Sequence, residues 1–338
     1  MSRWLKAGIP AAVIVLVLAA ICGINVREQH DNAEGFEKET NISEGPLSEA
    51  GESPLGSTAA EGVSEDGTLI WQGVTYKRNA HVKADLLMGI DPQGAADALF
   101  TAVHDTSKNT LKLLMIPRDS MMEMTETTAE GKSRQVITHI TLSHCGPGTP
   151  EEKAKRTVDA VEALLCGTKI DHYMAADVSL LAQINDLAGG VTVIVPNEEL
   201  EKADTTWKKG EQVVLHGADA ERFIRYRDTA VDGTPLLRME QHKAYIVGFY
   251  KKLKENKNLA VKISDHIEDA VTSDMSKGEY EKLMLDGLMC GFDPETDILI
   301  LPGEMTTGEE DGAVYDQFYI NYEETIPVLL DLFYRKVN

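Results

Sequence analysis

Arginine residues gather in one short stretch of this sequence, although the chain as a whole is acidic. Arg225 and Arg227 stand two residues apart in the segment IRYR, and Arg238 follows shortly after them. A fourth arginine, Arg118, lies far upstream in the segment IPRD, and the formal net charge of the chain is −22. Because a guanidinium group offers a planar fork of donors that fits phosphate oxygens, we expect these side chains to bind a phosphate-bearing ligand.

Two aspartates flank a short connection between two apolar runs. Asp91 follows the run that ends at residue 90, and Asp97 stands at the start of the next one. Carboxylates at adjacent strand ends suit a hard cation that also binds phosphate oxygens. The same pattern is also typical of a plain turn, because Asp91 precedes Pro92 and Asp-Pro is a good turn starter. The residues alone leave both interpretations open.

The spacing of the arginines constrains the backbone between them. On a continuous α-helix Arg225 and Arg227 would point about 200° apart. Both can therefore face one site only if a helix over residues 217–224 ends there and the chain extends beyond it. Otherwise one arginine is buried and the other exposed. Next to Arg118, Asp119 is expected to pair with that arginine and to orient it rather than to act as a catalyst.

The elements that must position these residues alternate between strands and helices, which predicts an α/β protein with one folded domain over residues 68–338. A capping box at Thr149 and Glu152, with Pro150 between them, predicts a helix start. Between residue 254 and about residue 333 the sequence predicts helices and one strand only. Strands are predicted over 85–90, 98–104, 111–116, 136–142, 191–195 and 298–301, a hairpin over 69–76, and helices over 178–187, 217–224 and 238–254.

The N-terminal part is predicted to anchor this domain to a membrane. Residues 7–26 carry no charge and are long enough to span a bilayer core. Basic residues precede this segment and an acidic stretch follows it, so we expect residues 1–6 in the cytoplasm and the bulk of the chain outside. Residues 27–67 read as a disordered acidic linker. A cleaved signal peptide and a lipoprotein processed at Cys22 are the alternatives.

Bulk composition narrows the function classes. A pI near 4.8 argues against nucleic acid as the main partner, because proteins that bind it carry a basic face. The four cysteines form neither a CxxC pair nor a zinc-spaced cluster with histidine. The sequence therefore predicts neither a disulfide framework nor a zinc site.

Several segments, in order along the chain, carry a resemblance to a known family. They are residues 86–91 (LLMGID), 96–100 (ADALF), 116–120 (IPRDS), 170–173 (IDHY), 185–191 (NDLAGGV) and 223–227 (FIRYR), followed by Asp232 and Arg238. Together they resemble the LytR-CpsA-Psr family of bacterial envelope proteins over roughly residues 68–338, and a single N-terminal anchor is also usual there. The resemblance implies one domain with a central mixed sheet flanked by helices.

The resemblance also implies a function and a set of roles. Family members are extracytoplasmic phosphotransferases that move a glycopolymer, of the teichoic acid or capsule type, from a polyprenyl-diphosphate carrier at the cytoplasmic membrane to peptidoglycan. It implies an apolar tunnel for the lipid tail. Asp232 is the candidate base for the acceptor hydroxyl, with Asp228 as its rival, and Arg227 acts in catalysis with it. By the same match Mg²⁺ is held by Asp91 and Asp97, and the diphosphate by Arg118, Arg225, Arg227 and Arg238.

Two departures from the family pattern bear on activity. The family usually has Arg or Gln shortly before the aspartate matched by Asp97, and here that contact is weakened or moved to Gln93. The helix after Arg238 usually reads R-x-x-R-Q, but here Gln241 stands for the second arginine and His242 for the glutamine. We expect His242 to bind the diphosphate too, more strongly when it is protonated.

These departures keep alternatives to the transferase open. One is a catalytically impaired protein that binds polyprenyl lipid or glycopolymer without turning it over. Another is a polyprenyl-diphosphate pyrophosphatase, in which water replaces the acceptor. Gene regulation is disfavoured, because the predicted topology leaves only residues 1–6 in the cytoplasm, too few to bind DNA.

Overall fold

The computed structural model describes residues 64, 67–127, 133–228, 234–279, 282, 289–310 and 313–337. The predicted cytoplasmic tail and transmembrane segment lie outside these residues, as does the predicted linker apart from residues 64 and 67. In the part of the chain that is described, no helix is long and apolar enough to cross a membrane.

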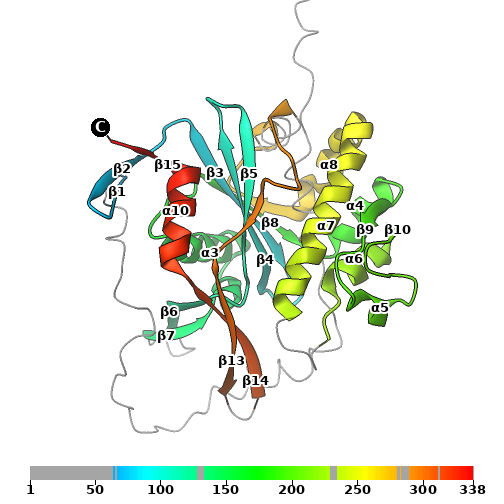
Figure 1. Cartoon of the computed structure of the whole chain (residues 1–338), viewed down its shortest axis with the longest axis horizontal. Helices are drawn as coiled ribbons and strands as arrows, with labels where there is room; N and C mark the ends of the chain where they lie inside the picture. The colour runs from blue at the N-terminus through cyan, green and yellow to red at the C-terminus, as the bar shows by residue number, and fades with distance from the viewer. Residues whose placement is uncertain are drawn as a thin grey trace, which may run out of the picture.

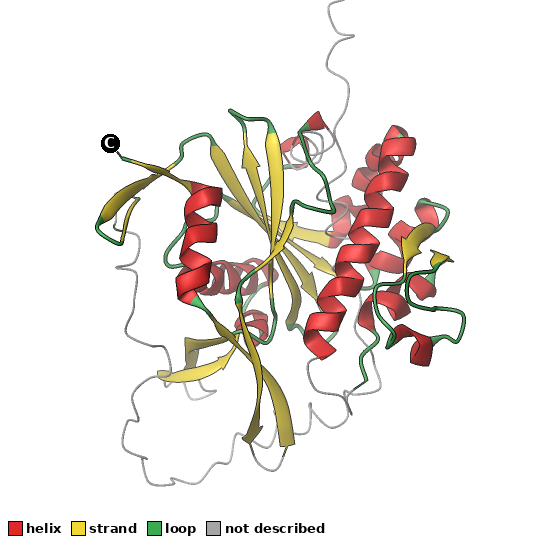
Figure 2. Ribbon diagram, viewed as in Figure 1, coloured by secondary structure: helices red, strands yellow, loops and turns green. Residues whose placement is uncertain are grey.

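A six-stranded mixed sheet forms the centre of the domain (Figures 1 and 2). The strand order is β11-β8-β3-β4-β5-β12; β3, β4 and β5 run antiparallel, whereas β8 and β12 lie parallel to β3 and β5. Every residue of β4 is buried, as expected for a strand covered on both faces. The bounds are β3 Val82–Ile90, β4 Ala96–Asp105, β5 Thr110–Ile116, β8 His172–Asp177, β11 Val271–Ser273 and β12 Ile298–Ile300.

Helices cover both faces of this sheet and enclose two apolar cores (Figure 1). Alternation along β3 divides its side chains between them, with Leu87 in one core and Leu86 and Met88 in the other. The first core is covered by α4 (Leu180–Leu187), α6 (Ala218–Arg225), α7 (Thr234–Glu255) and α8 (Lys257–Ile267), and the second by α3 (Pro150–Leu164) and α10 (Tyr322–Phe333); α5 spans Leu200–Ala203. The predicted α/β class with a central mixed sheet is confirmed.

Local sequence signals account for several of these elements. Thr149 accepts a hydrogen bond from the backbone N–H of Glu152, and the Glu152 carboxylate accepts one from the Thr149 N–H, so the predicted capping box is confirmed. In α7, Gly248 brings the helix close to β9, because a Cβ there would lie 2.2 Å from the Thr192 carbonyl oxygen. This close packing fixes the helix that carries Arg238.

Four small β-structures surround the main sheet. They are β1 (Thr68–Trp71) with β2 (Val74–Arg78) and β15 (Tyr334–Lys336), β6 (Met121–Thr127) with β7 (Ser133–His139), β9 (Val191–Ile194) with β10 (Gln212–Leu215), and β13 (Gly303–Glu310) with β14 (Ala313–Ile320). The predicted hairpin over 69–76 is confirmed.

Two sequence predictions were wrong in these peripheral structures. The strand predicted over 136–142 ends at His139, and a 3-10 helix, Ile140–His144, follows it. The prediction of a single strand, 298–301, between residue 254 and about residue 333 was also wrong, because β11, β13 and β14 lie there too. Strands β13 and β14 form a two-stranded ribbon in which β13 is rich in polar residues and Asp316 and Gln317 interrupt the apolar residues of β14, so neither has the continuous apolar run that marks an interior strand.

Candidate active site

Asp91, in the loop after β3, and Asp97, the second residue of β4, place two carboxylates at the same end of these central strands. Asp91 Oδ1 accepts hydrogen bonds from the backbone N–H groups of Gln93 (2.9 Å) and Ala95 (2.8 Å), so the turn interpretation is correct for that oxygen. Burial raises the pKa of Asp91, and the nearby charge of Asp97 raises it further. The two carboxylates therefore lie close enough to repel each other. The loop is also held by His144, whose Nδ1 lies 2.9 Å from the Gly94 carbonyl oxygen.

Arg118 follows β5 and lies against this acidic pair. Its Nη1 contacts Asp97 Oδ1, and its Nε lies 3.5 Å from Asp119 Oδ1. Burial alone would lower the pKa of Arg118, but the charges of Asp97 and Asp119 outweigh burial and raise it. Asp97 is 4% exposed, and its Oδ2 has no hydrogen-bond partner among the described residues. One oxygen of Asp97 thus holds Arg118, while the other is buried without a hydrogen-bond partner in the described structure.

Arg238 reaches the same place from α7. Its Nη2 lies 3.9 Å from Asp119 Oδ2, so Asp119 stands between two guanidinium groups and attracts both by its charge. Burial, and after it the positive charge of Arg118, lower the pKa of Arg238 to about 10. Two buried cations that repel each other create a region that favours an anion.

Helix α6 ends between Arg225 and Arg227, as the expectation that both face one site requires. The helix ends at Arg225, and Tyr226 is extended with φ −56° and ψ 129°. Arg225 pairs with Glu221 one turn earlier in α6, and its Nε and Nη2 are buried without a hydrogen-bond partner in the described structure. Burial lowers the pKa of Arg225; the opposing effects come from Glu221 and then from Asp97 and Asp91.

Arg227 completes the group of four. Its Nη1 lies 2.9 Å from Asp316 Oδ2 on β14. The positive charge of Arg227 also helps to lower the pKa of Arg238. Arg118, Arg225 and Arg238 therefore lie near Asp97, and Arg227 lies near Arg238, although the four come from three separate segments of the chain.

His242 lines the same region but is held as a neutral ring. Burial lowers its pKa to about 3, and the positive charge of Arg238 contributes to this shift. The ring stacks on Phe100 at a centroid distance of 6.3 Å and hydrogen bonds to the backbone of Ile224, the residue before Arg225. Burial and the charge of Arg238 keep the ring neutral at neutral pH in this structure, and the stronger phosphate binding expected of a protonated His242 stays a prediction.

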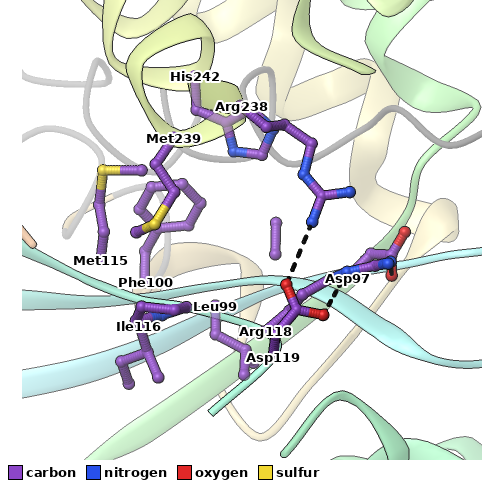
Figure 3. A pocket seen from close by; sticks show the side chains of 12 residues that line it. Asp97, Leu99, Phe100, Met115, Ile116, Arg118, Asp119, Arg238, Met239 and His242 are labelled. Carbon is purple, nitrogen blue, oxygen red and sulfur yellow. Dashed lines mark hydrogen bonds and ion pairs between the residues drawn. The ribbon is translucent and has the colours of Figure 1, made fainter. Parts of the chain in front are cut away.

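A cavity of about 20 Å³ lies between these residues. Figure 3 shows Arg238 reaching from α7 toward Asp119, with Met239 and His242 beside Phe100 on the apolar side. Such a volume holds about one water molecule. A diphosphate or a lipid tail does not fit it, so binding of either at this place requires the lining side chains to move apart.

The remaining predicted site residues fall into three groups. Asp232 lies outside the described residues. Its rival Asp228 accepts a 2.8 Å hydrogen bond from Lys202 at the surface, so it is already engaged by a cation. Gln93 is exposed, and the described contacts include none from its side chain to the arginines, whereas Gln241 is 1% exposed with its Oε1 unpartnered among the described residues.

The sequence interpretation missed two carboxylates in this site. Glu221 could have been found, because it stands four residues before Arg225, the spacing of an ion pair on one helix face. Asp316 carries no comparable signal, since its partner Arg227 lies 89 residues away in the chain.

The neutral state of His242 predicts a specific dependence of stability on pH. Its folded pKa of about 3 lies below the ordinary 6.5, so its stabilising effect is complete above about pH 6.5 and is lost as pH falls toward 3. Between pH 7 and pH 5 we expect the wild type to lose about 1–2 kcal/mol more unfolding free energy than His242→Gln, which keeps an N–H donor. Urea unfolding at both pH values checks this, and equal losses in both proteins would contradict it.

Known proteins and one family model are similar to this chain. The model of the LytR-CpsA-Psr (LytR_cpsA_psr) family matches residues 64–304. TagV of Bacillus subtilis (strain 168), a polyisoprenyl-teichoic acid–peptidoglycan teichoic acid transferase, is 27% identical over 221 residues, which cover 61% of this chain and 53% of TagV. The match thus spans about half the length of that relative.

Solved structures share the fold of the described domain. The crystal structure of B. subtilis TagV is similar with a TM-score of 0.56 and 23% identity, over 75% of this chain and 97% of TagV's. The structure of TagT bound to LI-WTA is similar with a TM-score of 0.54 and 21% identity, over 75% of this chain and 90% of TagT's.

Proposed function

The chain belongs to the LytR-CpsA-Psr family, and from this premise we propose that it is an extracytoplasmic phosphotransferase. It transfers a glycopolymer, of the teichoic acid or capsule type, from a polyprenyl-diphosphate carrier to peptidoglycan. The observation that carries the proposal is that Arg118, Arg225 and Arg238 lie close to the buried Asp97, with Arg227 close to Arg238. The transferase activity of the relative TagV supports the same reaction class.

The proposed reaction is one phosphoryl transfer. A hydroxyl oxygen of a peptidoglycan sugar attacks the phosphorus that carries the glycopolymer, the P–O–P bond breaks, and polyprenyl phosphate leaves. The hydroxyl proton passes to a carboxylate base, for which Asp232 remains the proposed residue. Preorganised guanidinium groups stabilise the charge that develops on the phosphate oxygens, and this is the main contribution that a protein makes to such a transfer.

The acidic pair fits a magnesium ion. Mg²⁺ is commonly held by one or two carboxylates together with substrate phosphates, rather than by a full protein cage. Asp91 and Asp97 supply two such carboxylates, and the Oδ2 of Asp97 is buried without a hydrogen-bond partner in the described structure. No cluster of three or more potential ligands occurs among the residues described. When bound, the ion would neutralise phosphate charge; Asp91 and Asp97 would hold it beside Arg118.

The proposed location follows from the N-terminal sequence. Residues 7–26 would span the cytoplasmic membrane once, with residues 1–6 inside and the domain outside, where both the lipid carrier and peptidoglycan are found. The acidic residues 27–67 would tether the domain at some distance from the lipid surface.

The test is transfer by the full-length chain in detergent micelles. The substrates are a polyprenyl-diphosphate-linked glycopolymer and peptidoglycan, with Mg²⁺ present. We expect polyprenyl phosphate and a phosphodiester-linked polymer on peptidoglycan, both measured by mass spectrometry. Polymer phosphate released equally well without peptidoglycan would favour the pyrophosphatase. Lipid that co-purifies with the chain but yields no product would favour the binding protein, for which the replacement of arginine by Gln241 is the motivating feature.

A further inference from the structure

The ribbon formed by β13 and β14 begins at the very end of the region that matches the family, residues 64–304, and is anchored beside the candidate site. In Figure 1 it extends away from the central sheet as a narrow twisted pair of strands. Phe318 of β14 is 1% exposed and fixes its base. Gly303 on the opposite strand makes this possible, because a Cβ there would lie 2.5 Å from the Phe318 ring and 2.4 Å from the Tyr319 carbonyl oxygen.

Backbone contacts join the ribbon to the loop that carries Arg118. The Phe318 N–H donates to the carbonyl oxygen of Asp119 at 2.8 Å, and Phe318 also pairs with Ser120 in an isolated parallel bridge. On the other side, His139 Nε2 lies 2.8 Å from the carbonyl oxygen of Asp316. These contacts fix the backbone of β14 at Asp316 and at Phe318. The side chain of Asp316 therefore extends from a fixed position.

The side chain of Asp316 contacts Arg227, which lies outside the helices and strands. Arg227 lies in residues 226–228, an extended segment without helix or strand pairing. Its Nη1 lies 2.9 Å from Asp316 Oδ2, and the two side chains are 23% and 17% exposed. A long arginine side chain loses substantial conformational freedom when it is fixed, and a charge-assisted hydrogen bond to a rigid carboxylate offsets that loss before any ligand arrives.

We propose that Asp316 is a positioning residue that holds the Arg227 guanidinium in the orientation needed to bind a diphosphate. The inference rests on the proposed function, since it assigns Arg227 to that ligand. The ribbon then contributes to the site in two ways. It fixes Arg227 through Asp316. It also fixes Asp119, the partner of Arg118 and Arg238, through Phe318.

The test is a double-mutant cycle that measures binding rather than turnover. The full-length chain in detergent micelles is titrated with geranylgeranyl diphosphate and Mg²⁺ by calorimetry. We expect Asp316→Ala to weaken binding about tenfold or more and Asp316→Asn, which keeps a hydrogen-bond acceptor of the same shape, to weaken it less. In an Arg227→Ala background, Asp316→Ala is expected to have no further effect, because Asp316 acts only through Arg227.

A control on the same ribbon separates positioning from general loss of charge or fold. Glu304→Ala removes an exposed carboxylate of β13 and is expected to bind like the wild type. Unchanged or tighter binding by Asp316→Ala, beside a wild type that binds, would overturn the inference and leave the proposed function standing. A full additional loss in the Arg227→Ala background would also overturn it, since Asp316 would then act by itself. If the wild type binds no diphosphate, both the positioning role of Asp316 and the proposed function are wrong.

Discussion

Replacing Arg118 by lysine is expected to lower the rate of glycopolymer transfer about 10²–10³-fold while leaving the protein folded. Arg118 lies at the centre of the site, because it contacts both Asp97 and Asp119. Lysine keeps the positive charge that these buried carboxylates need, so no uncompensated charge is left behind. It loses the planar fork of donors that can hold two carboxylates and a phosphate at once. Initial rates under saturating lipid carrier and peptidoglycan measure the effect.

The matched control is Arg222→Lys in α6. Arg222 also pairs with two carboxylates, Asp204 at 2.8 Å and Asp219 at 3.1 Å, but its side chain is 47% exposed on the surface. Exposed ion pairs contribute little, so transfer by this variant is expected to stay within about twofold of the wild type. If Arg118→Lys turns substrate over as fast as Arg222→Lys, the central role of Arg118 is wrong.

The central part of the fold follows from local sequence patterns. Strands β3, β4 and β5 are short apolar runs separated by turn residues, which identifies them as interior strands joined by tight connections. The pairing of Asp91 with Asp97 at the same end of these strands follows from the same hairpin. The end of α6 at Arg225 lies one residue from the end predicted at residue 224, which the hypothesis of a shared site for Arg225 and Arg227 required. In each case the relevant residues are close in sequence, so their spacing determines their geometry.

Other features of the site depend on tertiary contacts that spacing does not encode. Nothing in the local pattern of β14 indicates that Asp316 meets Arg227. The protonation state of His242 depends on burial and on Arg238, and these lower its pKa to about 3. Residue type identifies His242 as a group that can titrate, but only the tertiary structure shows the burial and the neighbouring cation that keep it neutral at neutral pH.

The small size of the cavity affects how the arginine cluster can bind a ligand. About 20 Å³ between Arg118, Arg238 and Phe100 leaves no room for a diphosphate, so the carboxylates partner the guanidinium groups while no substrate is bound. An incoming phosphate would compete with these carboxylates for the same donors. The energy of binding is then partly used to rearrange existing ion pairs, which favours a ligand that carries several negative charges over one that carries a single charge.

Asp97→Asn is expected to abolish the dependence of transfer on Mg²⁺ and to lower the transfer rate about 10³-fold. Asparagine has the same shape and can still accept a hydrogen bond from Arg118 through its Oδ1. It lacks the negative charge on the buried Oδ2, the oxygen that has no hydrogen-bond partner among the described residues. A hard cation loses most of its affinity for a site when an anionic oxygen ligand becomes a neutral amide. Transfer rate as a function of Mg²⁺ concentration, together with Mn²⁺ binding followed by electron paramagnetic resonance, measures both consequences.

Asp105→Asn provides the control on the same strand, because Asp105 lies at the opposite end of β4 and is similarly buried, at 8% exposed. Its Oδ1 accepts hydrogen bonds from Ser107 and Lys108 within a turn, so its replacement tests the cost of altering a buried β4 carboxylate without touching the site. This variant is expected to lose some stability and to keep both Mn²⁺ affinity and Mg²⁺-dependent transfer per folded molecule. If Asp97→Asn instead binds Mn²⁺ as tightly as Asp105→Asn, the carboxylate pair does not hold the metal and serves only to orient Arg118.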